Sequence, residues 1–241
     1  MKKSIRVLDK GLVRLEKHCA DDMDVVRAAR VSYGPKKPDA EKDAKLIAYM
    51  LRNEHGSPFE HTFFKFHIVA PIFVFRQWHR TRIGVSYNEL SARYSKMKDR
   101  FYIPKRWRAQ DVKNKQGSVK ADLDHEGCRE AALAHCKESM RVYDEMLRVG
   151  VAREMARMVL PVNLYSEMYF SANARSLMYF IALRSDKHAQ AETRRYSHAM
   201  AYFFKKEMPW TWRAFDSYLR SRKDRDYSEL FTYLKRTESR A

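Results

Sequence analysis

Residues 62–70 alternate between apolar and polar side chains, and this alternation limits the possible folds more than any other feature of the sequence. Side chains two positions apart share one face of a strand, so the stretch predicts a strand with one buried and one solvated face. Residues 5–15 and 163–170 also have strand-like sequences. The residues predicted for the buried face of the first strand are Phe64, Phe66, Ile68 and Ala70.

Helical periodicity dominates the rest of the chain. Apolar residues recur at three- and four-residue intervals, and Asp21 and Asn173 stand where helix N-caps are expected. Pro71 suits the first turn of a further helix, which carries Arg76 and Arg80. The other predicted helices cover residues 22–29, 40–51, 123–149, 151–160, 174–183, 184–204 and a last segment that begins at Pro209.

These elements predict one α+β domain over residues 1–241, with a small antiparallel sheet flanked by helices. No internal repeat, low-complexity tract or linker divides the chain. Charged residues are frequent over residues 221–241, and we expect this segment to be a frayed tail.

An arginine-rich stretch follows the central strand, between Arg76 and Tyr94. Guanidinium groups placed so closely repel one another unless an anion lies between them, and their planar donor forks fit phosphate. Gly84 predicts that the helix gives way to a loop, whose short polar groups can reach a ligand. A solvated basic surface is the alternative, but such a surface does not need these groups. The stretch contains Arg76, Arg80, Arg82, Arg93, Ser86, Asn88, Glu89 and Ser91.

A second polar cluster, over residues 157–188, also combines Arg with Asn and Ser near predicted helix ends. Phosphate groups bind Arg forks and the free N–H groups of helix starts, so the two clusters together predict a nucleotide site. The usual phosphate-binding loops are absent, as are recognisable Ser-His-Asp and Cys-His arrangements. His55 and His61 are six residues apart with no cysteine nearby, so we expect no metal site.

The net charge of +18 indicates an anionic partner, which leaves nucleic acid, an acidic membrane surface and phosphorylated small molecules open. The three cysteines show no paired metal-type spacing, and their odd number favours a reducing compartment. The sequence has no long apolar run and begins without an apolar signal segment. We therefore expect a cytoplasmic protein that does not associate with membranes.

Several ordered motifs resemble the flavin-dependent thymidylate synthases. That family's signature is Arg-His-Arg followed after seven or eight residues by Ser, and here Arg80-Thr81-Arg82 is followed after eight residues by Ser91. Other segments that are similar to the family, in the same order, are residues 55–61, 86–94, 101–104, 116–118, 156–161, 173–178 and 183–190. Together the segments cover most of the chain from about residue 45 to residue 215.

The resemblance implies an enzyme that makes dTMP by reductive methylation of dUMP. Arg184 would lie at the uracil edge and promote ionisation at N3, with no cysteine nucleophile, and His55 would act near the flavin or folate. The cysteines lie outside both polar clusters, which agrees with a thiol-independent route. The implied dUMP-binding residues are Gln77, Trp78, His79, Arg80, Glu89, Leu90, Ser91, Ala92, Arg93, Arg157 and Arg184.

The resemblance also implies FAD as the cofactor, methylenetetrahydrofolate as the carbon donor and NADPH as the reductant of the flavin. The family assembles its flavin sites between the subunits of a homotetramer. The implied FAD-binding residues are Ser57, Arg80, Thr81, Arg82, Glu89, Asn173, Ala174, Arg175, Tyr179 and His188.

Two positions depart from the family pattern. Thr81 replaces the middle histidine of the signature, and Tyr179 replaces a flavin-contacting Asn. Both changes concern the flavin and neither concerns dUMP. They leave open a homologue that binds nucleotides but has lost flavin chemistry. A basic nucleic-acid-binding protein is the other alternative, although nonspecific binders spread Lys and Arg along a groove instead of gathering them with Asn, Ser and Glu.

Overall fold

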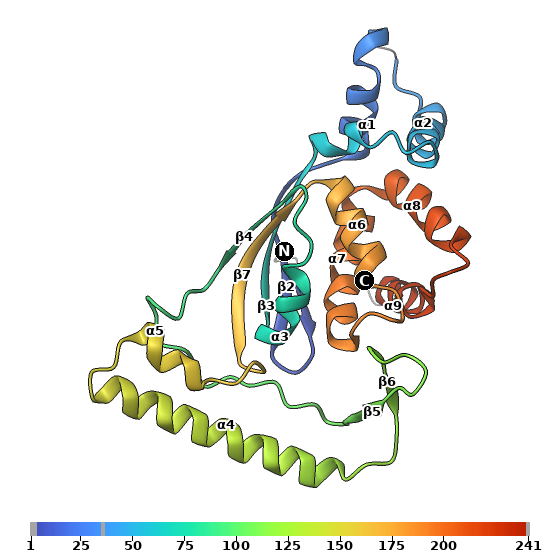
Figure 1. Ribbon diagram of the computed structural model, residues 1–241. Coiled ribbons are helices and arrows are strands. Elements are labelled where there is room, and N and C mark those ends of the chain that lie inside the picture. Colours follow the sequence, from blue (N-terminus) through green and yellow to red (C-terminus); the bar gives the residue numbers. More distant parts are fainter. Residues whose placement is uncertain (1–3, 35–36, 240–241) are drawn as a thin grey trace.

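A five-stranded antiparallel sheet lies at the centre of the fold (Figure 1). The structure is a computed structural model that describes residues 4–34 and 37–239. The spatial order of the strands is β1-β2-β3-β7-β4. Their bounds are β1 Ser4–Val7, β2 Gly11–Cys19, β3 Phe63–Pro71, β7 Tyr165–Ala172 and β4 Val85–Glu89.

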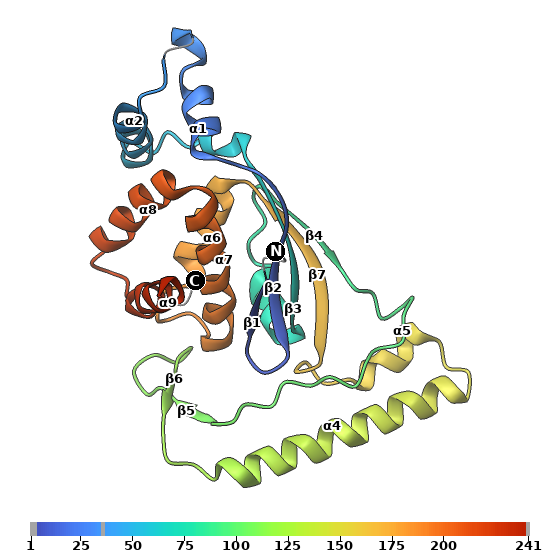
Figure 2. The ribbon, with the colours of Figure 1, turned by 180° about the vertical axis from the view of Figure 1, so that it is seen from behind.

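The predicted alternation in β3 is confirmed. Phe64, Phe66 and Ile68 are fully buried, while Lys65 and His67 lie half-buried on the opposite face. Helices of the carboxyl-terminal part of the chain cover the apolar face of the sheet (Figures 1 and 2). These are α6 Ala174–Arg184, α7 Ala191–Glu207, α8 Pro209–Ser221 and α9 Ser228–Glu238.

Most of the remaining elements lie at the two ends of the sheet (Figure 1). At one end are α1 Asp22–Ala29, η1 Val31–Tyr33, α2 Ala40–Arg52 and η2 Ser57–His61. At the other end are the hairpin of β5 Arg108–Gln110 and β6 Ser118–Lys120, α4 His125–Arg148, α5 Arg153–Ala156 and η3 Arg157–Val159. Helix α3 Ile72–Trp78 packs between β3 and α7 and contributes to the main core. None of the described helices is both long and apolar enough to cross a membrane.

Buried apolar residues form two clusters. The larger one fills the space between the sheet and α6–α9. The smaller one joins α4 to α5 and to the segment after β4, through Cys136, Tyr143, Met97 and Ala156. The long helix predicted over residues 123–149 is thus confirmed, and its buried stripe faces this second cluster.

The arginine-rich stretch differs from its prediction in two ways. Helix α3 ends at Trp78, so Arg80 lies beyond the helix and not on its surface. The expected loop after Gly84 is largely strand β4, because Val85 and Tyr87 pack against the core while Ser86 and Asn88 face away from it. Strand β4 thereby completes one edge of the sheet beside β7.

The carboxyl-terminal prediction is wrong for most of residues 221–241. Residues 228–238 form α9, in which Leu230 and Leu234 are buried against the main core. The four-residue spacing of these two leucines gives the helix an apolar stripe despite its many charged neighbours. Helix α7 also begins at Ala191 instead of near Arg184, since residues 185–190 form the connection between α6 and α7.

Candidate active site

The carboxyl end of α6 meets the carboxyl end of α3 at Arg184 and Gln77. The Nη2 atom of Arg184 donates to the backbone oxygen of Gln77 at 2.6 Å, and Nη1 donates to its side-chain oxygen at 3.4 Å. Burial lowers the pKa of the Arg184 guanidinium from its ordinary value, and nearby Arg80 acts in the same direction. Gln77 therefore orients the cation through neutral groups alone.

Three buried polar atoms near this junction have no hydrogen-bond partner. They are Nε of Arg184, Nε1 of Trp78 and Oγ1 of Thr81. In the described parts of the chain, no carboxylate forms an ion pair with Arg184. A buried donor without an acceptor costs about 1–3 kcal/mol, which an arriving ligand acceptor can recover.

Strand β4 forms a wall beside this cluster. The hydroxyl of Tyr87 donates to the backbone oxygens of Thr81 and Trp78. Burial raises the pKa of Tyr87 to about 12, so its hydroxyl stays a neutral donor at physiological pH. The ring of His79 packs edge-on against Tyr87 with centroids 5.0 Å apart, and its Nε2 lies 3.7 Å from Oε2 of Glu89.

A second group of predicted residues gathers at the amino end of α6. Asn173 caps the helix, since its Oδ1 accepts from the backbone N–H of Ser176 at 2.9 Å. A Cβ atom at Gly56 would lie 2.6 Å from the Arg175 guanidinium, so the turn that contains Ser57 closely approaches Arg175. Arg175 also pairs with Glu60 of that turn.

The loop before β4 reaches the same place. A Cβ atom at Gly84 would lie 2.2 Å from Oγ of Ser176 and 3.2 Å from Nδ2 of Asn173. Arg80 and Arg82 belong to the segment that leads to this loop, and neither side chain forms an ion pair or hydrogen bond within the described residues. Arg side chains and the free N–H groups of a helix start are both groups that bind phosphate.

Helix α6 therefore carries both groups of predicted residues, one at each end. It spans 11 residues, which corresponds to about 16 Å of helix at 1.5 Å per residue. Tyr179, which is 61% exposed, lies between the two ends. His188 lies just beyond the Arg184 end, and its Nδ1 is 2.7 Å from Oδ1 of the buried Asp186.

Other predicted residues lie elsewhere in this chain. Ala92 packs on the smaller apolar cluster, as do the residues around Arg157, which is itself exposed on η3. Figures 1 and 2 both show α5, which precedes η3, well apart from α6. Leu90, Ser91 and Arg93 flank Ala92 in the segment that leaves β4. Within a single chain, Arg157 is thus not brought to Arg184.

Two predicted contact residues are buried. Trp78 is fully buried, and its ring packs against Phe180 and Phe170 with centroids 4.6 Å and 5.5 Å apart. The Trp78 ring therefore packs into the core, while its Nε1 has no hydrogen-bond partner. Thr81 is 2% exposed, so a small hydroxyl stands in the interior at the position of the family's histidine.

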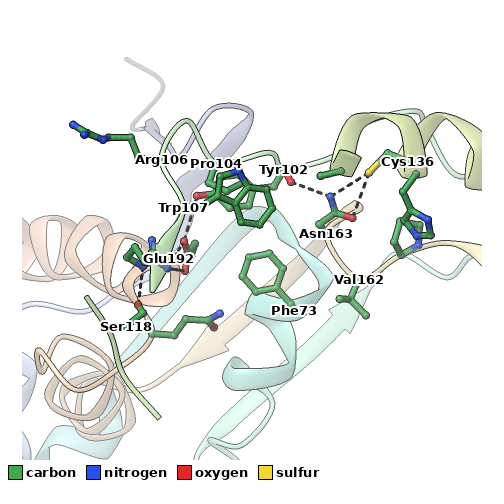
Figure 3. A pocket seen from close by; sticks show the side chains of 15 residues that line it. Phe73, Tyr102, Pro104, Arg106, Trp107, Ser118, Cys136, Val162, Asn163 and Glu192 are labelled. Carbon is green, nitrogen blue, oxygen red and sulfur yellow. Dashed lines mark hydrogen bonds and ion pairs between the residues drawn. The ribbon is translucent and has the colours of Figure 1, made fainter. Parts of the chain in front are cut away.

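A cavity of about 430 Å³ lies under the β5–β6 hairpin (Figure 3). Trp107 and Phe73 lie close together at its centre, with Glu192 on one side and Asn163 on the other. Glu192 is buried and accepts two hydrogen bonds from Nη2 of Arg108, at 2.8 Å and 2.9 Å, which tie the hairpin to α7. None of the predicted site residues lines this cavity.

A second cavity, of about 390 Å³, opens on the uncovered face of the sheet. Two predicted residues, Glu89 and Leu90, line it together with Asn88, His67 and Tyr169. It adjoins the Arg184 cluster through Glu89, which is near His79.

The sequence analysis did not include Tyr87 among the site residues. The alternation of Tyr87 with polar neighbours was the signal that could have identified it.

Similarity to known proteins indicates the family of this chain. The sequence model described as "Thymidylate synthase complementing protein" matches residues 14–210. The chain is 49% identical over 214 residues to the flavin-dependent thymidylate synthase of Thermosipho africanus. The aligned region covers 87% of this chain and 92% of that protein. The chain belongs to the flavin-dependent thymidylate synthase family.

Other members of the family are similar over comparable lengths. The flavin-dependent thymidylate synthase of Thermus thermophilus is 48% identical over 217 residues, which are 90% of this chain and 79% of that protein. The solved structure of the UMP/dUMP methylase PolB from Streptomyces cacaoi, bound with 5-Br UMP, superposes with a TM-score of 0.80. The two sequences are 35% identical, and the superposition covers 90% of this chain and 98% of the PolB chain. This similarity confirms the α+β fold.

Proposed function

We propose that this protein makes dTMP by reductive methylation of dUMP, as a flavin-dependent thymidylate synthase. The observation that carries the proposal is Arg184, a half-buried cation that is oriented by Gln77 and has a buried N–H without an acceptor. A fixed cation at the uracil edge stabilises negative charge that develops on the ring, and so promotes ionisation at N3. A thiol nucleophile is not needed, and the buried Cys136 belongs to the smaller apolar cluster.

We expect dUMP to bind beside Gln77 and Arg184, at the carboxyl end of α3. Gln77, His79 and Arg80 would contact dUMP together with the segment from Glu89 to Arg93, and Arg157 would bind its phosphate. Because Arg157 lies apart from Arg184 in one chain, we propose that it comes from a neighbouring subunit. The protein would then be a homotetramer with shared sites. Large apolar side chains exposed near the proposed residues support this: Ile83 is 89% exposed and Met158 is 69% exposed.

We propose that FAD binds at the amino end of α6. Arg80 and Arg82 have no described partner and would bind the diphosphate, while Ser57, Asn173 and Arg175 line the approach. The other proposed contacts are Thr81, Glu89, Ala174, Tyr179 and His188, with His55 beside the flavin. The reduced flavin supplies the hydride, methylenetetrahydrofolate the carbon and NADPH the electrons that regenerate the flavin. All three cysteines are free thiols, which is typical of the cytoplasm, where we place the protein.

Purified protein tests this proposal directly. We expect it to show flavin absorbance, to lose that absorbance with NADPH, and to form dTMP when dUMP and methylenetetrahydrofolate are supplied. A colourless protein that also fails to take up added FAD would contradict the proposed chemistry. Retained dUMP binding in such a protein would instead identify the homologue that only binds nucleotides.

Gly84→Ala is expected to weaken FAD binding about tenfold. Gly84 has a φ of 66°, which costs an alanine about 1–2 kcal/mol, and the new Cβ would displace Ser176 and Asn173 at the amino end of α6. Gly150→Ala is the matched control, because Gly150 has a φ of 90° but a Cβ added there would meet no heavy atom within 4 Å. FAD titration of both variants measures the effect, and equal affinities would show that the loop before β4 does not contact the flavin.

A further inference from the structure

A basic cavity of about 390 Å³ lies where the end of α7 meets α8 and α9. Figures 1 and 2 show these helices on the covered side of the sheet, together at the carboxyl-terminal end of the chain. Seven of its nine lining residues follow residue 210, where the match to the family's sequence model ends. None of the residues proposed to bind dUMP or FAD lines it.

The charges around this α8–α9 cavity are unbalanced. Four basic side chains line it, Lys205, Arg213, Arg220 and Lys235, against a single carboxylate, Asp216. That carboxylate is already paired, because Nε of Arg220 lies 2.7 Å from its Oδ2 and Nη2 lies 3.3 Å from its Oδ1. Arg220 and Asp216 neutralise each other, which leaves Arg213 and Lys235 as lining cations that no lining carboxylate pairs with.

Two of the cations have no side-chain partner among the described residues. Arg213 and Lys235 are exposed, and neither side chain forms a hydrogen bond or ion pair with another residue that the structure describes. They project from different helices, α8 and α9, into one cavity. Cations gathered in this way repel one another, and an anion between them removes that repulsion.

The third cation, Arg220, is held in place. Its guanidinium carbon lies 3.8 Å from the centroid of the Phe231 ring, while its donors bond Asp216. A guanidinium fixed between a ring and a carboxylate loses little conformational freedom when it binds an anion. Buried Trp212 and Leu234 form the apolar part of the lining. The volume of about 390 Å³ lies in the range of small-molecule sites.

We propose that the α8–α9 cavity binds the phosphate groups of a small phosphorylated molecule. Arg213 and Lys235 would contact the phosphate oxygens from opposite helices, and Arg220 would contribute its positive charge from the cavity wall. The site is separate from the proposed active site and does not depend on the proposed function. It also accounts for part of the large positive charge of the chain, which binding of dUMP and FAD leaves unexplained.

Isothermal titration calorimetry of the full-length protein with pyrophosphate tests this proposal. Arg213→Gln combined with Lys235→Gln should weaken pyrophosphate binding at one site at least about tenfold. Lys206→Gln combined with Arg236→Gln is the control, because it removes the same charge from positions of α7 and α9 that do not line the cavity. Thermal melting should show that both double variants remain folded, since none of the four side chains has a described partner.

Equal pyrophosphate affinities in the two double variants would overturn the proposal. A single-stranded oligothymidylate provides the second arm. If the cavity variant loses affinity for the oligonucleotide but the parent protein does not bind pyrophosphate, the surface is a nucleic-acid interface and the small-molecule site is refuted. Loss of pyrophosphate binding in the cavity variant, with normal dTMP formation, is the result that we expect. A parent protein without dTMP formation would contradict the proposed function alone.

Discussion

Arg184→Ala is expected to lower dTMP formation at least about a hundredfold, the usual scale for loss of one preorganised charge in an active site. The fold should remain intact, because the Arg184 side chain forms hydrogen bonds only with Gln77 within the described residues. Turnover in steady-state assays and dUMP affinity by calorimetry measure the two effects separately. Near-normal turnover in a folded variant would remove Arg184 from the mechanism.

The pH dependence of this variant provides a sharper test. A cation beside N3 favours the ionised ring and lowers the pKa of the bound uracil, so its removal should shift the rising limb of the pH–rate profile to higher pH. Arg184→Lys keeps the charge but loses the planar fork, and should retain more activity than Arg184→Ala. Arg129→Ala, a change in an exposed pair on α4, is the control and should leave the profile unchanged.

Gly11→Ala is expected to destabilise the fold by about 3 kcal/mol, which combines overpacking with the loss of a buried hydrogen bond. The new Cβ would lie 2.0 Å from the Tyr196 hydroxyl, 2.5 Å from the backbone oxygen of Val7 and 2.9 Å from that of Val69. Tyr196 is fully buried, and its hydroxyl donates to Val69 at 2.9 Å, so it cannot move away freely. The melting temperature should fall by roughly 6–12 °C.

A double-mutant cycle checks this cause. Tyr196→Phe removes the hydroxyl that the new Cβ would meet, so Gly11→Ala should cost less in that background. The rescue should be partial, because the two backbone oxygens remain in place. Strictly additive effects of the two substitutions on the free energy of unfolding would show that the hydroxyl does not cause the strain.

The sequence predicted those elements whose pattern is local. Alternation in β3 identified the buried face of the sheet, and side-chain caps identified the starts of α1 and α6, where Asp21 and Asn173 accept backbone hydrogen bonds as expected. The long helix α4 followed from its apolar stripe. Each of these signals depends on a few adjacent residues, which is why no knowledge of the tertiary structure was needed.

Features that depend on distant contacts were not predictable in this way. Strand β4 is short, and only pairing with β7 distinguishes it from the loop that Gly84 suggested. Helix α9 is stabilised by burial of Leu230 and Leu234 against the main core, which its charged composition conceals. The burial of the Trp78 ring also depends on distant residues, since it packs against Phe170 and Phe180. The meeting of Arg184 and Gln77, 107 residues apart, required the fold itself.

Helix α6 also fixes the relative orientation of its two ends, since Asn173 caps one end and Arg184 follows from the other without a break. Inserting one residue midway would turn everything beyond it by about 100° and advance it by about 1.5 Å. The guanidinium would then leave Gln77 while the cap stayed where it is. Natural variation in the length of this segment should consequently be absent, because even a whole added turn would move Arg184 by about 5.4 Å along the helix axis.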